Sequence, residues 1–295
     1  MPSSSFFAVV QVPFCDVRKE PMQSSLQRMK KDPLQETQCL YGDTLKVLSE
    51  QESWVEVEIP NQPHKEKSYT GFVAKKNLLF GEKPYTTNKT LLKPTLELLS
   101  NTPFCIGTHL FIENIDEPYA SIRLPDGKKG KVKKESLEGD PIDSLLKESG
   151  SPYLWGGISN YLPSYKNSHS GIDCSGLVYL FFRMHNKVIP RNASCQHSFC
   201  TPLHPSELQK YDLIFFFNQK TGYIDHTMLY LGDNAILEAT MRTMTIRVVE
   251  AETRLLKKIE FLEEKPLVEH FEVSFGRFPK KELFKKEEKD VHCKA

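Results

Sequence analysis

A cysteine at position 174 has the surroundings of a nucleophile. It lies within the segment 171–177, GIDCSGL, and an apolar-rich stretch over 175–186 follows it, which predicts a helix that starts next to the thiol. The unpaired N–H groups at a helix N-terminus favour a thiolate, so we expect a lowered pKa for Cys174. Small neighbours, Ser175 and Gly176, leave room for a substrate carbonyl, and the Cys174 N–H is a candidate oxyanion donor. Taken alone, this residue could equally be a buried structural cysteine.

A histidine and a glutamate are candidates for the base and its orienting partner. His226 precedes a strand predicted over 227–231, and a second strand is predicted over 235–239 after a three-residue loop at 232–234. In that hairpin His226 and Glu238 form a diagonal pair on one face, within reach of each other. We expect Glu238 to accept the Nδ1–H of His226 as the third member of a triad. Taken singly, the two residues could be a satisfied, partly buried histidine and an exposed strand carboxylate.

The elements that must hold these residues follow the helix in the sequence. Further strands are predicted over 213–217 and 245–249, so that one helix precedes an antiparallel meander. This order is typical of the α+β class, and we place the domain at 141–280.

Two β-rich units precede this domain. Short strands separated by Gly, Pro and Asp turns recur, and the segment 54–59 alternates apolar and polar residues at period two. We expect a first β domain over 1–82 and a second over 83–140, each a small barrel. A polar tail is expected over 281–295.

The composition excludes several classes of protein. The chain has 295 residues and a formal net charge of +1, with basic and acidic residues interleaved, which argues against a nucleic-acid or membrane-surface binder. No apolar run reaches the roughly 18–20 residues that span a bilayer, and the first residues lack a signal-peptide pattern. Seven scattered cysteines indicate a reducing compartment instead of a disulfide framework. We expect a cytoplasmic monomer, with export by a route without a signal peptide as the open alternative.

A second group of possible metal ligands lies between the helix and the strands. It consists of Cys195, His197, Cys200 and His204. Their spacing is irregular, and the sequence has no second cysteine pair that could complete a zinc-binding set with them. We therefore expect no zinc site. The chemistry expected of Cys174 and His226 needs neither a metal nor an organic cofactor.

Several motifs together resemble one enzyme family. They are PYLWGG at 152–157, DCSGL at 173–177, IPR at 189–191 followed by Gln196, DLIFF at 212–216, and the segment 226–232. In this order and at these spacings, the chain resembles the NlpC family of papain-like peptidases, which cleave the stem peptides of bacterial peptidoglycan. The resemblance implies a papain-like domain in which a central helix packs on an antiparallel sheet. It places the third catalytic member twelve residues after the histidine (238 − 226 = 12), at Glu238, where the family more often carries His, Asn or Gln.

The resemblance extends to the two β-rich units. They look like the bacterial SH3-like domains that precede the catalytic domain in one branch of the family. That branch resembles the γ-D-glutamyl-diaminopimelate endopeptidases of cell-wall recycling, which act on small peptides with a free N-terminal L-Ala. The resemblance therefore implies peptidoglycan-derived peptides as substrates.

The same resemblance implies roles for residues close to the thiol. Tyr153 would support the oxyanion through its hydroxyl, together with the Cys174 N–H, and Trp155 would contact the substrate. The loop over 158–172 is longer than the family implies, and is either a lid or a solvated insertion.

Other residues would recognise the free amino terminus of the peptide. Asp173 and Ser175 would hold the ammonium group, one as a charged acceptor and the other as a neutral one. The first β unit would close one end of the groove, with Tyr69 and Glu36 as its candidate contacts.

Two further functions fit the same chain. One is a wall-binding protein whose SH3-like units carry an inactive catalytic domain, and the reactivity of the Cys174 thiol would separate it from a peptidase. The other is an acyltransferase on the same core, which a product assay with an amine acceptor would reveal.

Overall fold

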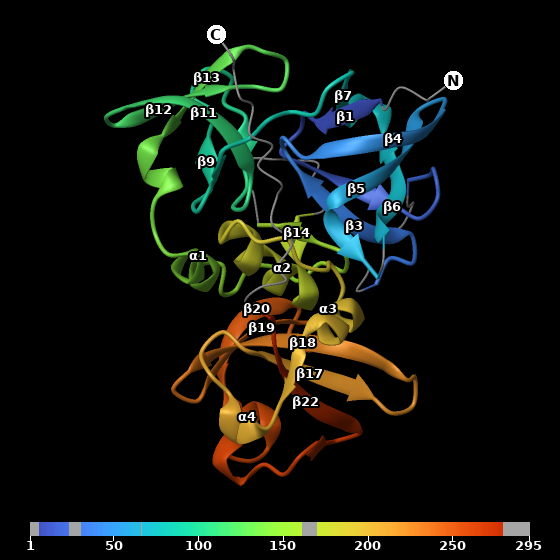
Figure 1. The fold of residues 1–295 in the computed structure, drawn as a ribbon, viewed down its shortest axis with the longest axis vertical. Coiled ribbons are helices and arrows are strands. Elements are labelled where there is room, and N and C mark those ends of the chain that lie inside the picture. Colours follow the sequence, from blue (N-terminus) through green and yellow to red (C-terminus); the bar gives the residue numbers. More distant parts are fainter. Residues whose placement is uncertain (1–5, 24–30, 66, 161–169, 280–295) are drawn as a thin grey trace.

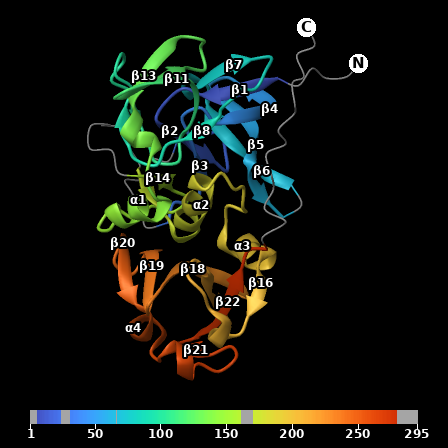
Figure 2. The same cartoon turned by 60° about the vertical axis from the view of Figure 1, so that its left-hand side comes forward.

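The computed structural model describes residues 6–23, 31–65, 67–160 and 170–279. Two β-rich units, coloured blue to green in Figure 1, lie at one end of the molecule, and a large sheet coloured orange to red lies at the other. Helix α2 (Cys174–Met184) lies between them in both views (Figures 1 and 2). No helix within these described ranges has the length and apolar character needed to cross a membrane.

The first unit is a seven-stranded antiparallel sheet in the order β3-β2-β6-β5-β4-β1-β7. Val55, Val57 and Ile59 point into its core while the alternate residues are more exposed, as the period-two pattern predicts. Its elements are β1 (Phe7–Val10), β2 (Phe14–Arg18), β3 (Gln35–Leu40), β4 (Thr44–Gln51), β5 (Trp54–His64), β6 (Lys67–Ala74), the 3₁₀ turn η1 (Lys75–Asn77) and β7 (Leu78–Gly81).

The second unit is smaller and consists of a four-stranded sheet, β13-β12-β11-β8, beside a two-stranded one, β10-β9. Its core contains Leu91, Phe104 and Ile122. Its elements are β8 (Lys89–Thr90), β9 (Thr95–Leu96), β10 (Pro103–Phe104), β11 (His109–Asp116), β12 (Tyr119–Arg123), β13 (Lys129–Lys133) and η2 (Lys134–Leu137).

The prediction of two closed barrels is wrong. Within the described residues, no pairing joins the edge strands β3 and β7 of the first sheet, or β13 and β8 of the second. In the first unit, β3 packs instead on the C-terminal region, where the side-chain oxygen of Gln38 accepts the N–H groups of Ile158 and Ser159. Four strands are too few to close the second sheet. The SH3-like character of these units stays a prediction.

The C-terminal region has one antiparallel seven-stranded sheet in the order β16-β22-β17-β18-β19-β20, with β21 also paired to β22. Four of its strands agree with the predicted meander, whereas β22, next to β17, was not predicted. Its elements are α1 (Pro141–Lys147), β14 (Ile158–Ser159), β15 (Gly171–Ile172), α2, α3 (Ala193–Phe199), β16 (Thr201–Leu203), η3 (Pro205–Glu207), β17 (Leu213–Asn218), β18 (Tyr223–Gly232), β19 (Ala235–Thr240), β20 (Thr245–Glu250), α4 (Ala251–Leu255), η4 (Ile259–Phe261), β21 (Leu267–Val268) and β22 (Phe271–Arg277).

Helix α2 is buried on all sides, so its sequence is apolar around most of its circumference. Its core packs against the C-terminal sheet and also against residues of both β-rich units, including Phe14 and Ile106. The exception in composition is Arg183, whose guanidinium donates to Asp43 of the first unit (2.6 Å) and to the Gly107 carbonyl of the second (2.6 Å). The helix that begins at Cys174 is thus fixed by all three parts of the chain.

Candidate active site

A cavity of about 530 Å³ brings most of the predicted site residues together. Cys174 and His226 both line it, so the predicted nucleophile and the predicted base share one cleft. Tyr153, Trp155, Asp173, Ser175, Tyr69 and Glu36 line the same cavity, and Glu238 lies behind His226 instead. The cavity therefore has one wall from the C-terminal region and another from the first β-rich unit.

The thiol of Cys174 sits in the first turn of α2, as predicted, but its pKa is not lowered. Burial and the neighbouring Asp173 carboxylate raise the pKa of Cys174 to about 12, although backbone N–H groups of Thr227 and Ser175 act in the opposite direction. Burial disfavours a thiolate more than one helix end favours it. The raised pKa argues against the predicted thiolate in the free protein.

His226 and Glu238 are in direct contact. His226 Nε2 lies 2.7 Å from Glu238 Oε2, and the carboxylate is fully buried. The predicted pair is confirmed, but the predicted nitrogen is wrong, because Nε2–H donates to Glu238 and not Nδ1–H. This hydrogen bond leaves Nδ1 as the nitrogen that can take a proton from a nucleophile.

A hairpin with a bulge sets this contact. Leu229 pairs with Leu237 and Tyr230 with Ile236, as a three-residue loop would give, but the register shifts before Gly232. The turn itself has two residues, Asp233 and Asn234, both with positive φ, which Asn and Asp tolerate better than other side chains. Because the shift is confined to the end of the hairpin, the diagonal relation of residues 226 and 238 is kept.

Two arginines that were not predicted complete the surroundings of Glu238. Arg247 donates through Nε and Nη2 to Oε1 (2.9 and 2.7 Å), and Arg254 Nε donates to Oε2 (3.0 Å). Burial alone would raise the pKa of Glu238, but the hydrogen bond from His226 and the charges around it hold that pKa well below its usual range. These contacts favour the ionised form of Glu238 beside the candidate base.

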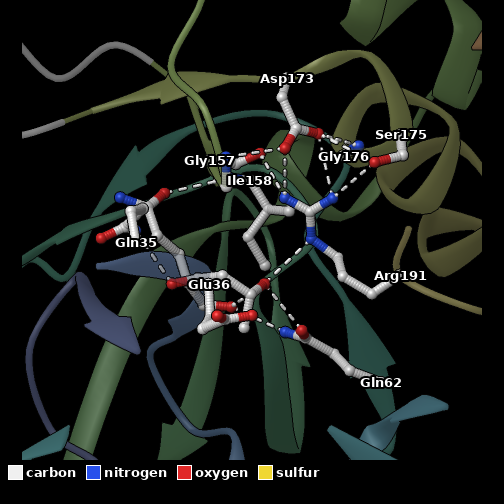
Figure 3. A network of polar contacts seen from close by, with 12 residues as sticks. Gln35, Glu36, Gln62, Gly157, Ile158, Asp173, Ser175, Gly176 and Arg191 are labelled. Atoms are coloured by element: carbon white, nitrogen blue, oxygen red, sulfur yellow. Dashed lines mark hydrogen bonds and ion pairs between the residues drawn. The ribbon is translucent and has the colours of Figure 1, made fainter. Parts of the chain in front are cut away.

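On the other side of the thiol, Asp173 caps α2 and pairs with a buried arginine. Its Oδ1 accepts the Gly176 N–H (2.5 Å), and Arg191 contacts both carboxylate oxygens at 3.0 Å. Figure 3 shows the guanidinium between Asp173 and Ser175. Arg191 is only 2% exposed, so its charge is available to Asp173 and not to solvent. The predicted role of Asp173 as a counter-charge for an ammonium is therefore weakened, because Arg191 already neutralises it.

Arg191 also ties this pair to the first β-rich unit. Its Nε donates to the Thr37 hydroxyl (3.0 Å), and that hydroxyl in turn donates to Gln62 (2.8 Å). Figure 3 labels Arg191 and Gln62 at the two ends of this network. The Arg191 N–H donates to the Pro63 carbonyl (3.2 Å). Hydrogen-bonded residues thus connect β3 and β5 to the N-terminus of α2.

Two glycines of the predicted motifs are required by close packing at this helix start. A Cβ on Gly176 would lie 2.2 Å from the Gly157 carbonyl oxygen, and one on Gly157 would lie 2.2 Å from the Gly171 carbonyl oxygen. Any side chain here would push the helix away from β14 and β15. The motifs are therefore explained by packing as much as by substrate access.

The remaining predicted residues are placed as follows. Tyr153 is buried near the thiol, and burial together with the Cys174 and Asp173 charges raises the pKa of its phenol, which keeps it a hydrogen-bond donor. Tyr69 OH donates to Glu36 Oε2 (3.2 Å) at the cavity wall formed by the first unit. Most of the loop predicted over 158–172 lies outside the described residues.

Three of the four possible metal ligands, for which the sequence predicts no zinc site, contact different neighbours. The Cys195 sulfur lies 3.6 Å from Nδ1 of His64, His197 packs edge-on against Phe215, and His204 caps η3. In the described part of the chain, no three metal-ligating side chains of the His, Cys, Asp and Glu types form a cluster.

Sequence reasoning missed four basic residues of the site. They are Lys31, Arg191, Arg247 and Arg254. The sequence analysis includes Arg191 in the motif IPR at 189–191 but assigns it no role. Arg247 could have been found, because a short turn after β19 places it directly opposite Glu238. Lys31 and Arg254 carry no such local signal.

Residues 150–261 match the NlpC/P60 family. A protein of Bacillus cereus named gamma-D-glutamyl-L-lysine dipeptidyl-peptidase is 26% identical over 245 residues, which are 74% of this chain and 71% of that protein. A protein of the same name from Bacillus subtilis is 27% identical over 247 residues, 77% of this chain and 79% of that protein.

The fold is also similar to a solved structure. The crystal structure of an NlpC/P60 family protein from Bacillus cereus aligns with a TM-score of 0.73 and covers 92% of this chain and 99% of that chain, at 22% identity. The NlpC/P60 fold is thereby confirmed, and the similarity includes the β-rich units as well as the C-terminal region.

Proposed function

We propose that this chain, whose residues 150–261 match the NlpC/P60 family, is a cysteine peptidase that hydrolyses the bond between a γ-D-glutamyl residue and a diamino acid in peptidoglycan stem peptides. The observation that carries the proposal is the shared cavity. Cys174 and His226 line it together with the hydrogen-bonded pair Glu36 and Tyr69. A cavity that contains both a nucleophile and a carboxylate wall suits a short peptide with a free amino terminus.

The reaction begins from a neutral thiol. The Cys174 sulfur attacks the γ-carbonyl carbon as His226 Nδ1 takes the thiol proton, and Glu238 stabilises the resulting imidazolium through Nε2. The Cys174 N–H and the Tyr153 hydroxyl donate to the oxyanion. The carbon–nitrogen bond then breaks, and His226 gives its proton to the leaving amine of the diamino acid.

The second half releases the acyl group. Water attacks the thioester carbonyl and gives a proton to His226, and the carbon–sulfur bond breaks as that proton returns to Cys174. The products are a dipeptide that ends in D-Glu and a peptide that begins with the diamino acid. These steps need no group besides the residues named.

Recognition of the free amino terminus falls to Glu36. Its carboxylate has Tyr69 as a neutral partner, whereas Asp173 is already paired with Arg191. An ammonium group bound by Glu36 gains a charge-assisted hydrogen bond that an acetylated amine cannot make. Ser175 is a second, neutral acceptor at the cavity wall, although its hydroxyl also contacts Arg191.

Two diamino acids fit the position after the bond that is cut, L-lysine and diaminopimelate. The names of the two relatives specify L-lysine, whereas the motifs resemble a branch that acts on diaminopimelate. Both diamino acids offer the same α-amine as leaving group, so the chemistry above applies to either one.

The direct test is mass spectrometry of L-Ala-γ-D-Glu peptides that continue with L-lysine or with diaminopimelate. We expect the wild-type protein to cut at least one of them after D-Glu, and the Cys174→Ala variant to cut neither. Cys195→Ala is the matched control, because it removes another buried thiol with an imidazole neighbour and should keep full activity.

Three outcomes would contradict the proposal. Absence of cleavage by the wild-type protein removes the substrate, and equal cleavage by Cys174→Ala removes the nucleophile. If an N-acetylated peptide is cut as fast as the peptide with a free amino terminus, Glu36 does not recognise that terminus.

A further inference from the structure

One basic side chain at the candidate catalytic cavity has no acidic partner among the residues that the structure describes. Lys31 lines the cavity, and its Nζ lies 4.3 Å from the centre of the Trp155 ring. No ion pair joins Lys31 to a carboxylate of the described residues. An ammonium group on the open face of an indole stays charged and remains able to bind an anion.

The other two strong cations of the cavity are already engaged. Arg191 is paired with Asp173, and Arg254 is paired with Glu238. Both arginines are also more buried than Lys31, which is exposed at the cavity edge. An anionic group of a ligand would therefore meet Lys31 before either arginine.

Lys31 shares the cavity with Glu36 and Cys174. Trp155 precedes Gly156, whose backbone packs against Glu36 and whose N–H donates to Asp173, the residue before the nucleophile (2.8 Å). The residue after Trp155 is thus close both to the Glu36 backbone and to the residue that precedes Cys174. A ligand that reaches from Glu36 to Cys174 lies in the cavity that Lys31 also lines.

The proposed substrate carries an anion at this position. A glutamyl residue linked through its γ-carbonyl keeps its α-carboxylate free. That carboxylate branches from the chain between the amino-terminal ammonium and the carbonyl attacked by Cys174. In the peptide, the order of groups is therefore cation, anion, reacting carbonyl, and the cavity contains a side chain suited to each of them, Glu36, Lys31 and Cys174.

We propose that Lys31 binds the free α-carboxylate of the D-glutamyl residue and makes the enzyme selective for D-Glu over D-isoglutamine, its α-amide. This inference rests on the proposed function and adds a specificity residue to it. Lys31 touches substrate through a single point charge, so its contribution falls as ionic strength rises.

The test uses two peptides that differ only in this group, L-Ala-γ-D-Glu-L-Lys and its α-carboxamide. We expect the wild-type protein to prefer the carboxylate by about five- to tenfold in kcat/KM, as for a partly exposed charged contact. Lys31→Met should reduce this preference to near unity by raising KM for the carboxylate peptide. Lys31→Glu should reverse it.

Two controls make the result specific. Lys19→Met removes an exposed lysine of a neighbouring cavity and should leave the preference unchanged. In the Cys174→Ala background, the dipeptides L-Ala-γ-D-Glu and L-Ala-D-isoglutamine should show the same preference in calorimetric binding, and Lys31→Met should abolish it. This measurement needs no turnover and also reports whether the variant is folded.

The outcomes separate this inference from the function on which it rests. If the wild-type protein cuts both peptides at equal rates, or if Lys31→Met keeps the preference, Lys31 has no such role while the peptidase stands. If the wild-type protein cuts neither peptide and binds neither dipeptide, both proposals fall.

Discussion

Nε2 of His226 lies 2.7 Å from Oε2 of Glu238, and the same oxygen accepts Nε of Arg254 at 3.0 Å. The candidate base is thus held by a carboxylate that is itself held by arginines. The hydrogen bond from His226 and the charges of the arginines lower the pKa of Glu238, so its negative charge is available to support an imidazolium.

Replacing Glu238 with glutamine keeps the shape and removes the charge. We expect kcat to fall by about 10²-fold, because the imidazolium loses its partner. We also expect a stability loss of roughly 3 kcal/mol, because Arg247 and Arg254 are left without their carboxylate. Steady-state kinetics and urea unfolding at pH 7 measure the two effects.

The same substitution should also change how the free energy of unfolding depends on pH. The folded-state pKa of Glu238 is lowered, so its carboxylate stabilises the protein above the unfolded pKa of about 4.3, and this stability is lost as pH falls toward the folded value. Between pH 5 and 3, unfolding free energy should therefore decline more steeply for the wild type than for Glu238→Gln. Parallel curves would show that Glu238 is not ionised in the way described.

The raised pKa of the Cys174 thiol predicts slow alkylation at neutral pH. Because iodoacetamide reacts with the thiolate, its rate at Cys174 should rise about tenfold per pH unit from pH 7 to 10 without levelling. Peptide mass mapping follows the reaction at this residue, and Cys174→Ala gives the background from the other thiols. A rate that levels near neutral pH would indicate a resting thiolate–imidazolium pair instead.

The Thr37 hydroxyl should matter for catalysis although it lies in the first β-rich unit. Thr37→Val removes the acceptor of Arg191 Nε and should cost about 1–2 kcal/mol of stability and reduce kcat several-fold. Thr37→Ser keeps the hydroxyl and should restore kcat. Thr70→Val, at an exposed position of β6, is the control that should change neither quantity. If Thr37→Ser is as impaired as Thr37→Val, packing and not the hydroxyl is responsible.

The ion pair between Arg183 and Asp43 should be a major contribution to the stability of the whole chain. Both side chains are nearly fully buried, so Asp43→Asn leaves a buried guanidinium without its counter-charge and should cost about 3–5 kcal/mol in thermal or urea unfolding. The matched change in an exposed pair, Glu113→Gln opposite Arg123, should cost under about 1 kcal/mol. Equal costs for the two would show that Asp43 carries little of the contact between α2 and the first unit.

Local patterns in the sequence determined the catalytic elements. The helix start at Cys174 follows from a capping residue before an apolar run, and the strands around His226 and Glu238 follow from short apolar runs around one turn. Such features depend on neighbours a few residues away, because hydrogen-bond geometry in helices and hairpins fixes what lies on one face. The contact between residues 226 and 238 could therefore be predicted from their spacing.

Tertiary structure alone decided the charges and the state of the nucleophile. Arg191 reaches Thr37 across 154 residues of sequence, and Arg183 reaches Asp43 across 140. The pKa of Cys174 depends on how deeply α2 is buried between the units, and the choice of Nε2 depends on how the His226 ring is oriented. Burial and long-range charge pairing depend on atoms from distant parts of the sequence that the fold brings together. No local pattern in the sequence specifies them.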